Sequence, residues 1–116
     1  MSRKSDFRVV DYLQHILDAI TRIDSYILDR SPDEFADSFM IQGAVIRNLE
    51  VIGEAAINIR SIDPATAASY PEWDQICGMR NRLTHGYFDI NIDLIWRTAQ
   101  KDLPPFCRHI QSILGR

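Results

Sequence analysis

Apolar residues recur at steps of three and four along most of the chain, and no stretch alternates as a strand would. The clearest case lies near the start of the chain. Its apolar stripe consists of Val10, Leu13, Ile16, Leu17, Ile20, Ile23 and Ile27. This spacing places the whole set on one face of an amphipathic helix. The pattern predicts a first helix over Asp6–Asp29.

The next segment combines a helix-start signal with a long apolar pattern. Ser31 suits an N-cap, Pro32 the first helical position and Glu34 the reciprocal position of a capping box. We therefore expect a short helix over Pro32–Asp37, followed by a long one over Ser38–Arg60. Five small residues in the long segment allow another helix to approach closely: Gly43, Ala44, Gly53, Ala55 and Ala56. Ile62-Asp63-Pro64 is expected to end it.

The second half of the chain continues the helical pattern. A loose turn is expected over Ala65–Ser69, then a helix over Glu72–His85 with Gly86 as a left-handed C-cap. The candidate buried residues of that helix are Trp73, Ile76, Cys77, Met79 and Leu83. A last helix is expected over Ile92–Leu114, kinked or interrupted by Pro104-Pro105, which remove two backbone donors.

These elements predict an all-α fold. We expect an up-and-down bundle of four main helices plus short helical pieces, forming a single domain over residues 1–116. A helical bundle carries no information about function by itself, so the function must be argued from particular side chains.

Composition narrows the classes of protein that the chain can represent. Hydrophobic residues make up 46% and charged residues 25% of the chain, a balance typical of globular proteins. No apolar run is long enough to span a membrane, and no secretory signal follows the first residues, so we expect a cytoplasmic protein. Cys77 and Cys107 are expected to be reduced thiols, and the spacing of cysteines and histidines predicts neither a metal site nor a bound cofactor.

Charge is distributed unevenly along the chain. Residues 1–75 hold 7 Lys and Arg against 13 Asp and Glu, whereas residues 76–116 hold 6 against 3. A net charge of -3 argues against non-specific coating of nucleic acid. The basic second half nevertheless permits a local phosphate site.

The residues with the clearest chemistry lie at the end of the fourth predicted helix, in Arg80-Asn81-Arg82-Leu83-Thr84-His85-Gly86-Tyr87. A histidine can move a proton near neutral pH, and an arginine can hold a phosphate as charge develops on it. Asn81 can set the tautomer of His85 or contact the phosphate itself. RNA cleavage without a metal would use these groups directly, although arginine and histidine are also favoured at helix C-termini by the helix dipole.

Helix geometry complicates this interpretation. Arg80 and His85 are five residues apart and point roughly 140° away from each other on a regular helix. A tightened last turn would bring them together. A symmetric dimer that pools the residues of two copies would do the same.

Several other residues have both a structural and a functional interpretation. Glu50 and Glu54 favour a solvated face with intrahelical ion pairs over a paired-carboxylate site, and Glu54 is a candidate to orient Arg80 or Arg82. Four aromatic residues favour core or dimer interface over base stacking: Trp73, Trp96, Phe35 and Phe39. His15 and His109 are expected to have no chemical role. Three cations fit a phosphate track and a solvated face equally well: Arg97, Lys101 and Arg108.

The stretch Gly78–Phe88 resembles the signature of the HepT-like toxins, a family of the HEPN domain superfamily. The block Arg47–Ala56 is similar to a second recurring block of that family, and Asp93-Leu94-Ile95-Trp96 followed by Leu103-Pro104 is similar to its closing helix. The resemblance covers nearly the whole chain, in the expected order.

The resemblance implies a function that periodicity alone does not. HepT-like proteins are homodimeric helical bundles with the R-x4-6-H motifs of both subunits near a shared cleft. They act as metal-independent endoribonucleases and as the toxin of a toxin–antitoxin pair. Their partner is a minimal nucleotidyltransferase antitoxin that transfers AMP to the motif tyrosine, here Tyr87.

Carried over residue by residue, the resemblance makes Arg80 and His85 the catalytic pair, Asn81 the polar residue beside them and Tyr87 the modified residue. Arg82 adds a possible phosphate contact. The rival hypothesis is a non-catalytic helical module whose motif face engages a nucleotidyltransferase or a nucleotide. A purely structural helical dimer is the third alternative.

Overall fold

The computed structural model describes residues 8–85 and 90–116, without the side chain of His85. All regular structure in these ranges is helical, which confirms the all-α prediction. The α-helices are α1 (Val9–Ile27), α2 (Pro32–Ala36), α3 (Phe39–Ile62), α4 (Pro64–Ala68), α5 (Trp73–His85), α6 (Ile92–Arg97) and α7 (Leu103–Ile113), and a π-helical segment, η3 (Thr98–Asp102), joins the last two.

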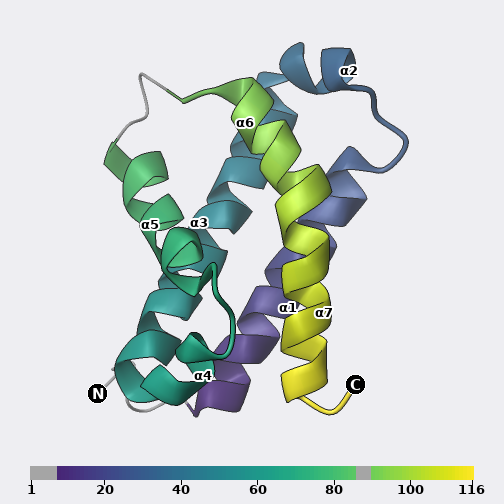
Figure 1. The fold of residues 1–116 in the computed structure, drawn as a ribbon. Helices are drawn as coiled ribbons and strands as arrows, with labels where there is room; N and C mark the ends of the chain where they lie inside the picture. The colour runs from purple at the N-terminus through teal and green to yellow at the C-terminus, as the bar shows by residue number, and fades with distance from the viewer. Residues whose placement is uncertain (1–7, 86–89) are drawn as a thin grey trace.

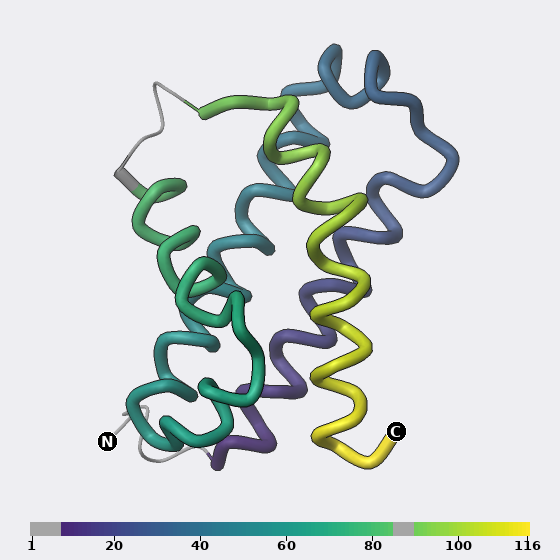
Figure 2. Tube along the Cα trace, in the orientation of Figure 1, coloured from purple at the N-terminus to yellow at the C-terminus, as the bar shows by residue number. Residues whose placement is uncertain are grey.

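The helix α3 is the central element of the bundle. It packs against α1 along one side and α5 along another, while α7 packs against α1 (Figure 1). The short α2 lies at one end, against α3 and α6. Figure 2 shows that α1 begins at the end of the bundle where the C-terminus lies. Arg116 contacts Gln14 there at 2.7 Å, from Nη1 to Oε1.

Local sequence signals start the helices α2 and α3. Ser31 Oγ accepts from the Glu34 amide at 3.1 Å, and Glu34 Oε1 accepts from the Ser31 amide at 2.9 Å, so the predicted capping box is confirmed. Ser38 is the N-cap of α3, where its Oγ accepts from the Ile41 amide at 3.2 Å.

Several predicted boundaries differ from the structure by one to three residues, and one expected turn is a helix. The helix α1 ends at Ile27 rather than Asp29, because Leu28 leaves the helical conformation with ψ of 128° and Asp29 follows in a left-handed one with φ of 59°. The helix α3 continues to Ile62, two residues beyond Arg60. The expected loose turn is the helix α4, because Asp63 both ends α3 and caps α4 by accepting from the Thr66 amide.

The last predicted helix is interrupted before its two prolines. Pro104 and Pro105 lack the amide protons that the carbonyls of Gln100 and Lys101 would receive in an α-helix. The chain widens over η3, where the Leu103 amide donates to the Thr98 carbonyl five residues back. The predicted interruption is therefore confirmed, and its form is a π-helical turn.

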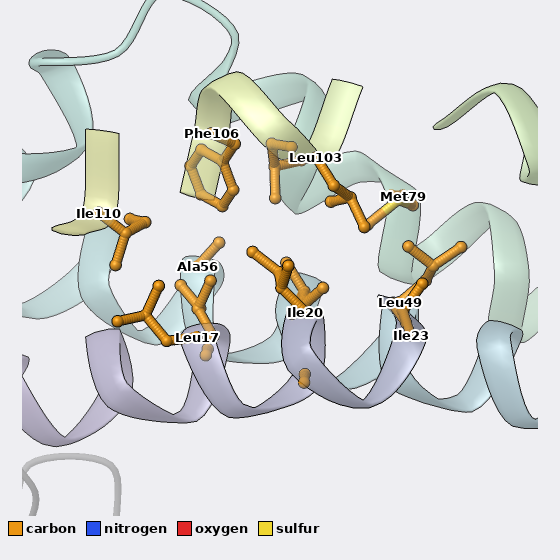
Figure 3. Close-up of a cluster of buried hydrophobic side chains, with 14 of the residues drawn as sticks. Leu17, Ile20, Ile23, Leu49, Ala56, Met79, Leu103, Phe106 and Ile110 are labelled. Carbon is orange, nitrogen blue, oxygen red and sulfur yellow. The ribbon is translucent and has the colours of Figure 1, made fainter. Parts of the chain in front are cut away.

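The core lies between α1, α3, α5 and α7. Figure 3 shows Leu17, Ile20 and Ile23 of α1 beneath side chains from these other helices. The candidate buried residues of α5 are all buried, as predicted. Trp73 links three helices, because its Nε1 donates to the Ala56 carbonyl at 3.0 Å and its ring meets Phe106 edge-on at 5.4 Å.

Two apolar residues at the start of α3 lie outside this core. Phe39 is 88% exposed and Met40 82% exposed, so the core interpretation of Phe39 is wrong, although Phe35 is buried and contacts Trp96. The dimer-interface alternative for Phe39 stays a prediction. No helix within residues 8–85 and 90–116 is long and apolar enough to cross a membrane.

Candidate functional site

The site begins where α5 crosses α3 at Gly53. A Cβ on Gly53 would lie 2.7 Å from the Cβ of Arg80, closer than two packed carbon atoms tolerate, and 3.1 Å from its backbone nitrogen. Glycine is therefore needed here for close approach. The crossing fixes the backbone of Arg80 directly against α3, so the position of this arginine depends on helix packing rather than on a loop.

The guanidinium of Arg80 is held by two neighbours. Its Nε lies 3.1 Å from Glu54 Oε2, and both side chains are about half exposed, at 41% and 52%. Its Nη1 donates to Asn81 Oδ1 at 3.2 Å. Among the described residues Nη2 has no hydrogen-bond partner, so that end of the fork is available to an anion.

A second contact between the same two helices lies one turn further on. Thr84 Oγ1 donates to Glu50 Oε2 at 3.0 Å. Both carboxylates of α3 thus face α5 and bind across the helix pair. Glu54 is exposed and Glu50 half-buried, but among the described residues neither forms the expected intrahelical ion pair, so that part of the interpretation is wrong. The candidate orienting contact between Glu54 and Arg80 is present.

These contacts border a polar cleft of about 400 Å³ between α1, α3 and α5. Arg47, Glu50, Glu54 and Asn58 line it from α3, Arg80 and Thr84 from α5, and Tyr12 and His15 from α1. Tyr12 and His15 also contact each other edge-to-face, with ring centroids 5.8 Å apart. The cleft, which we call the Arg80 cleft, brings two arginines and a histidine together on an acidic protein.

The opposite side of α5 borders a different and larger hollow. Met79, Leu83 and Arg82 line a groove of about 980 Å³ between α5 and the α6–η3 segment, which contributes Lys101. Asn81 reaches this groove as well and so lies between the two spaces. Arg82 and Arg80 thus face different hollows, and the structure does not bring Arg82 into the Arg80 cleft.

Part of the predicted motif lies outside the described residues. His85 is the last residue of α5, but its side chain lies outside the described residues, as do Gly86 and Tyr87. The predicted C-cap and the modified tyrosine are therefore untested. The end of α5 at His85 does match the predicted helix boundary.

Neither cysteine has the setting of a nucleophile. Burial raises the pKa of the Cys77 thiol and likewise that of Cys107, so the reactive thiolate is disfavoured at both positions. Both are free thiols, as predicted. Across residues 8–85 and 90–116 no three His, Cys, Asp or Glu side chains are grouped as metal ligands would be.

Sequence patterns did not predict several of the residues that line the cleft, and two of these are His15 and Arg47. His15 was expected to have no chemical role, yet it lines the same hollow as Arg80, and Arg47 was named only as the first residue of the block Arg47–Ala56. The spacing of the apolar stripe placed His15 off the buried face of α1. It gave no indication of which other helix would lie beside that exposed face.

The model of the "Ribonuclease HepT-like" family matches residues 16–113, which include every described residue of the Arg80 cleft except Tyr12 and His15. No solved structure matches the chain.

Individual relatives support the same assignment. A Caldanaerobacter subterraneus protein named "Putative RNase" is 33% identical over 105 residues, covering 90% of this chain and 93% of that protein. The "Probable ribonuclease HepT" of Thermococcus cleftensis is 35% identical over 94 residues, 81% of this chain and 84% of its own length. A Methanocaldococcus jannaschii protein named as both a gamma-glutamylcyclotransferase and a "putative RNase" is 35% identical over 103 residues; the match covers 89% of this chain but 46% of that protein.

Proposed function

The chain belongs to the HepT-like ribonuclease family, and from this premise we propose that it is a metal-independent endoribonuclease acting as the toxin of a toxin–antitoxin pair. The observation that carries the proposal is the placement of Arg80. Its guanidinium is fixed by Glu54 and Asn81 beside an open polar cleft, five residues before His85 at the end of the same helix.

In the proposed reaction the RNA supplies its own nucleophile. The ribose 2′-oxygen attacks the adjacent phosphorus while its proton passes to a base, and the bond from phosphorus to the 5′-oxygen breaks as that oxygen gains a proton. His85 serves in these proton transfers as general base or acid. Arg80 neutralises the charge that develops on the phosphate oxygens in the transition state. Asn81 orients Arg80 by accepting a hydrogen bond from its Nη1. The products are a 2′,3′-cyclic phosphate end and a 5′-hydroxyl end.

Cleavage in the presence of EDTA tests this proposal. Purified protein should cut an RNA pool under these conditions and leave cyclic phosphate ends. Persistent inactivity on several RNA pools would instead support a non-catalytic module that engages a nucleotidyltransferase or nucleotide.

Glu54 supports the reaction by positioning Arg80. Replacing it as Glu54→Gln keeps the shape of the side chain but removes the charge that holds Nε, so kcat should fall about tenfold, equivalent to roughly 1.4 kcal/mol of transition-state stabilisation. KM should change little. Stability should change by less than about 1 kcal/mol, because the pair is half exposed. Single-turnover cleavage and thermal unfolding measure these effects.

Glu50→Gln is the matched control for this variant. Glu50 lies one turn away on α3, lines the same cleft and binds Thr84 rather than Arg80. It should lower kcat much less than Glu54→Gln. Equal losses in the two variants would mean that the cleft responds to its overall charge, and Glu54 would then have no particular role in positioning Arg80.

The proposed control of the toxin acts on Tyr87, and the proposed active form is a homodimer that places two motifs at one cleft. Transfer of AMP from ATP to the tyrosine oxygen by a minimal nucleotidyltransferase releases pyrophosphate and leaves a bulky anion two residues from His85. Such a group competes with the RNA phosphate for the arginines of the motif.

Intact mass measures this modification directly. Co-expression with a minimal nucleotidyltransferase antitoxin should raise the mass of the chain by whole AMP units, and Tyr87→Phe should abolish the increase because it removes the acceptor oxygen. Tyr26→Phe, on α1, should leave the increase unchanged. Modification that persists in Tyr87→Phe would place the acceptor elsewhere.

A further inference from the structure

The charges of the Arg80 cleft are not all compensated in the same way. Glu54 is engaged by Arg80 at 3.1 Å and Glu50 by Thr84 at 3.0 Å. Arg47 is exposed on the same face of α3, and among the described residues it forms no ion pair. Of the two arginines that line the cleft, Arg47 is thus the one that no described carboxylate binds directly.

The opposite wall of the cleft adds a second donor. His15 projects from α1 into the hollow that Arg47 and Arg80 line from α3 and α5. Its ring packs edge-on against Tyr12, which is only 5% exposed, so the imidazole is held in place by a buried side chain. A protonated imidazole has two N–H donors, so His15 can meet a phosphate oxygen while it keeps a contact that it already makes.

We propose that Arg47 and His15 form a second phosphate subsite, which binds a phosphodiester of the RNA strand next to the one held at Arg80. This inference rests on the proposed ribonuclease function. A guanidinium fork with an N–H donor opposite it suits the non-bridging oxygens of a phosphate. The cleft volume of about 400 Å³ lies within the range of small-ligand sites and fits a short piece of strand.

The two glutamates explain why the subsite is local. Glu54 is paired with Arg80, whereas Glu50 accepts a hydrogen bond from Thr84 and keeps its negative charge, so only the phosphates that lie at Arg80 and at Arg47 are favoured. The arrangement favours a strand that follows α3 from Arg80 toward Arg47. It predicts no contribution from the cations of α6 and α7, which lie outside this cleft.

Binding of uncleavable RNA tests the subsite apart from catalysis. The probe is a short, fluorescein-labelled 2′-O-methyl oligoribonucleotide, which lacks the attacking hydroxyl, with anisotropy measured over a range of salt concentrations. Arg47→Ala should weaken binding about tenfold, equivalent to roughly 1.4 kcal/mol. It should also reduce the slope of log K against log salt by about 0.7, the value for one phosphate contact on a single strand. His15→Ala should weaken binding severalfold.

Arg97→Ala is the matched control, because it removes the same charge from an exposed position on α6. It should leave affinity and slope close to those of the parent protein. Equal effects of Arg47→Ala and Arg97→Ala, or no RNA binding by the parent, would overturn the subsite. If the parent protein cleaves RNA but Arg47→Ala binds it as tightly as the parent does, the subsite alone is overturned. If binding depends on Arg47 but the parent protein does not cleave RNA, only the ribonuclease proposal is overturned.

Discussion

Arg80→Ala is expected to slow RNA cleavage at least about a hundredfold, since removal of one preorganised donor to a developing anion costs that much in other enzymes. His85→Ala should have a comparable effect, because general acid–base catalysis contributes about a hundredfold to ten-thousandfold. Both variants should also abolish growth arrest on expression. Single-turnover cleavage of labelled RNA in EDTA is the direct measurement.

Structural consequences of Arg80→Ala should be small by comparison. Its side chain is 41% exposed, and the ion pair with Glu54 lies at the surface, so the free energy of unfolding should change by less than about 1 kcal/mol. Arg82→Ala offers a control on the same helix, because Arg82 faces the groove on the other side of α5. It should reduce cleavage far less. Full activity in both Arg80→Ala and His85→Ala would disprove the catalytic assignment.

Gly53→Ala is expected to impair stability and activity together. The added methyl group would lie 2.7 Å from the Cβ of Arg80, so α5 must move away from α3. Overpacking of this kind costs about 1–3 kcal/mol. A displacement of Arg80 by about 1 Å can reduce the rate by as much as a hundredfold. Chemical denaturation and single-turnover cleavage of the same preparation would measure both effects.

Gly43→Ala provides the comparison on the same helix. A Cβ at Gly43 would meet nothing within 4 Å, so alanine there should stabilise the protein by about 0.5–1 kcal/mol through its higher helix propensity, with activity unchanged. The same change to alanine should thus stabilise the protein at Gly43 and destabilise it at Gly53. If both variants were stabilised, α5 would not be held as close to α3 as this geometry requires.

The parts of the fold that were predictable from sequence depend on neighbouring residues. The capping box of Ser31 and Glu34 is complete within four positions, so its sequence pattern suffices. Pro104-Pro105 predicted an interruption for the same reason, but not its π-helical form, which depends on how the preceding carbonyls find other donors. Asp63 was read as a helix end, although its carboxylate also starts α4.

The site required contacts that connect distant parts of the chain. Gly53 was predictable as a place of close approach, but its partner Arg80 follows only from the crossing of α3 and α5. The pairing of Glu54 with Arg80 spans 26 positions and was one of several alternatives for that carboxylate. His15 could not be connected with Arg80 from periodicity, because helical spacing identifies the exposed face of α1 without its neighbours.

The groove beside Arg82 has a consequence for how such a chain can change over generations. It separates the second half of α5 from α6, so Arg80 is positioned mainly by the crossing with α3, while α7 meets α5 near its start, where Phe106 packs on Trp73. Substitutions in α6 that face this groove can therefore accumulate as long as the bundle stays folded. Substitutions at Gly53 would instead be selected against, because a single added carbon atom there disturbs both the packing of α5 on α3 and the position of Arg80.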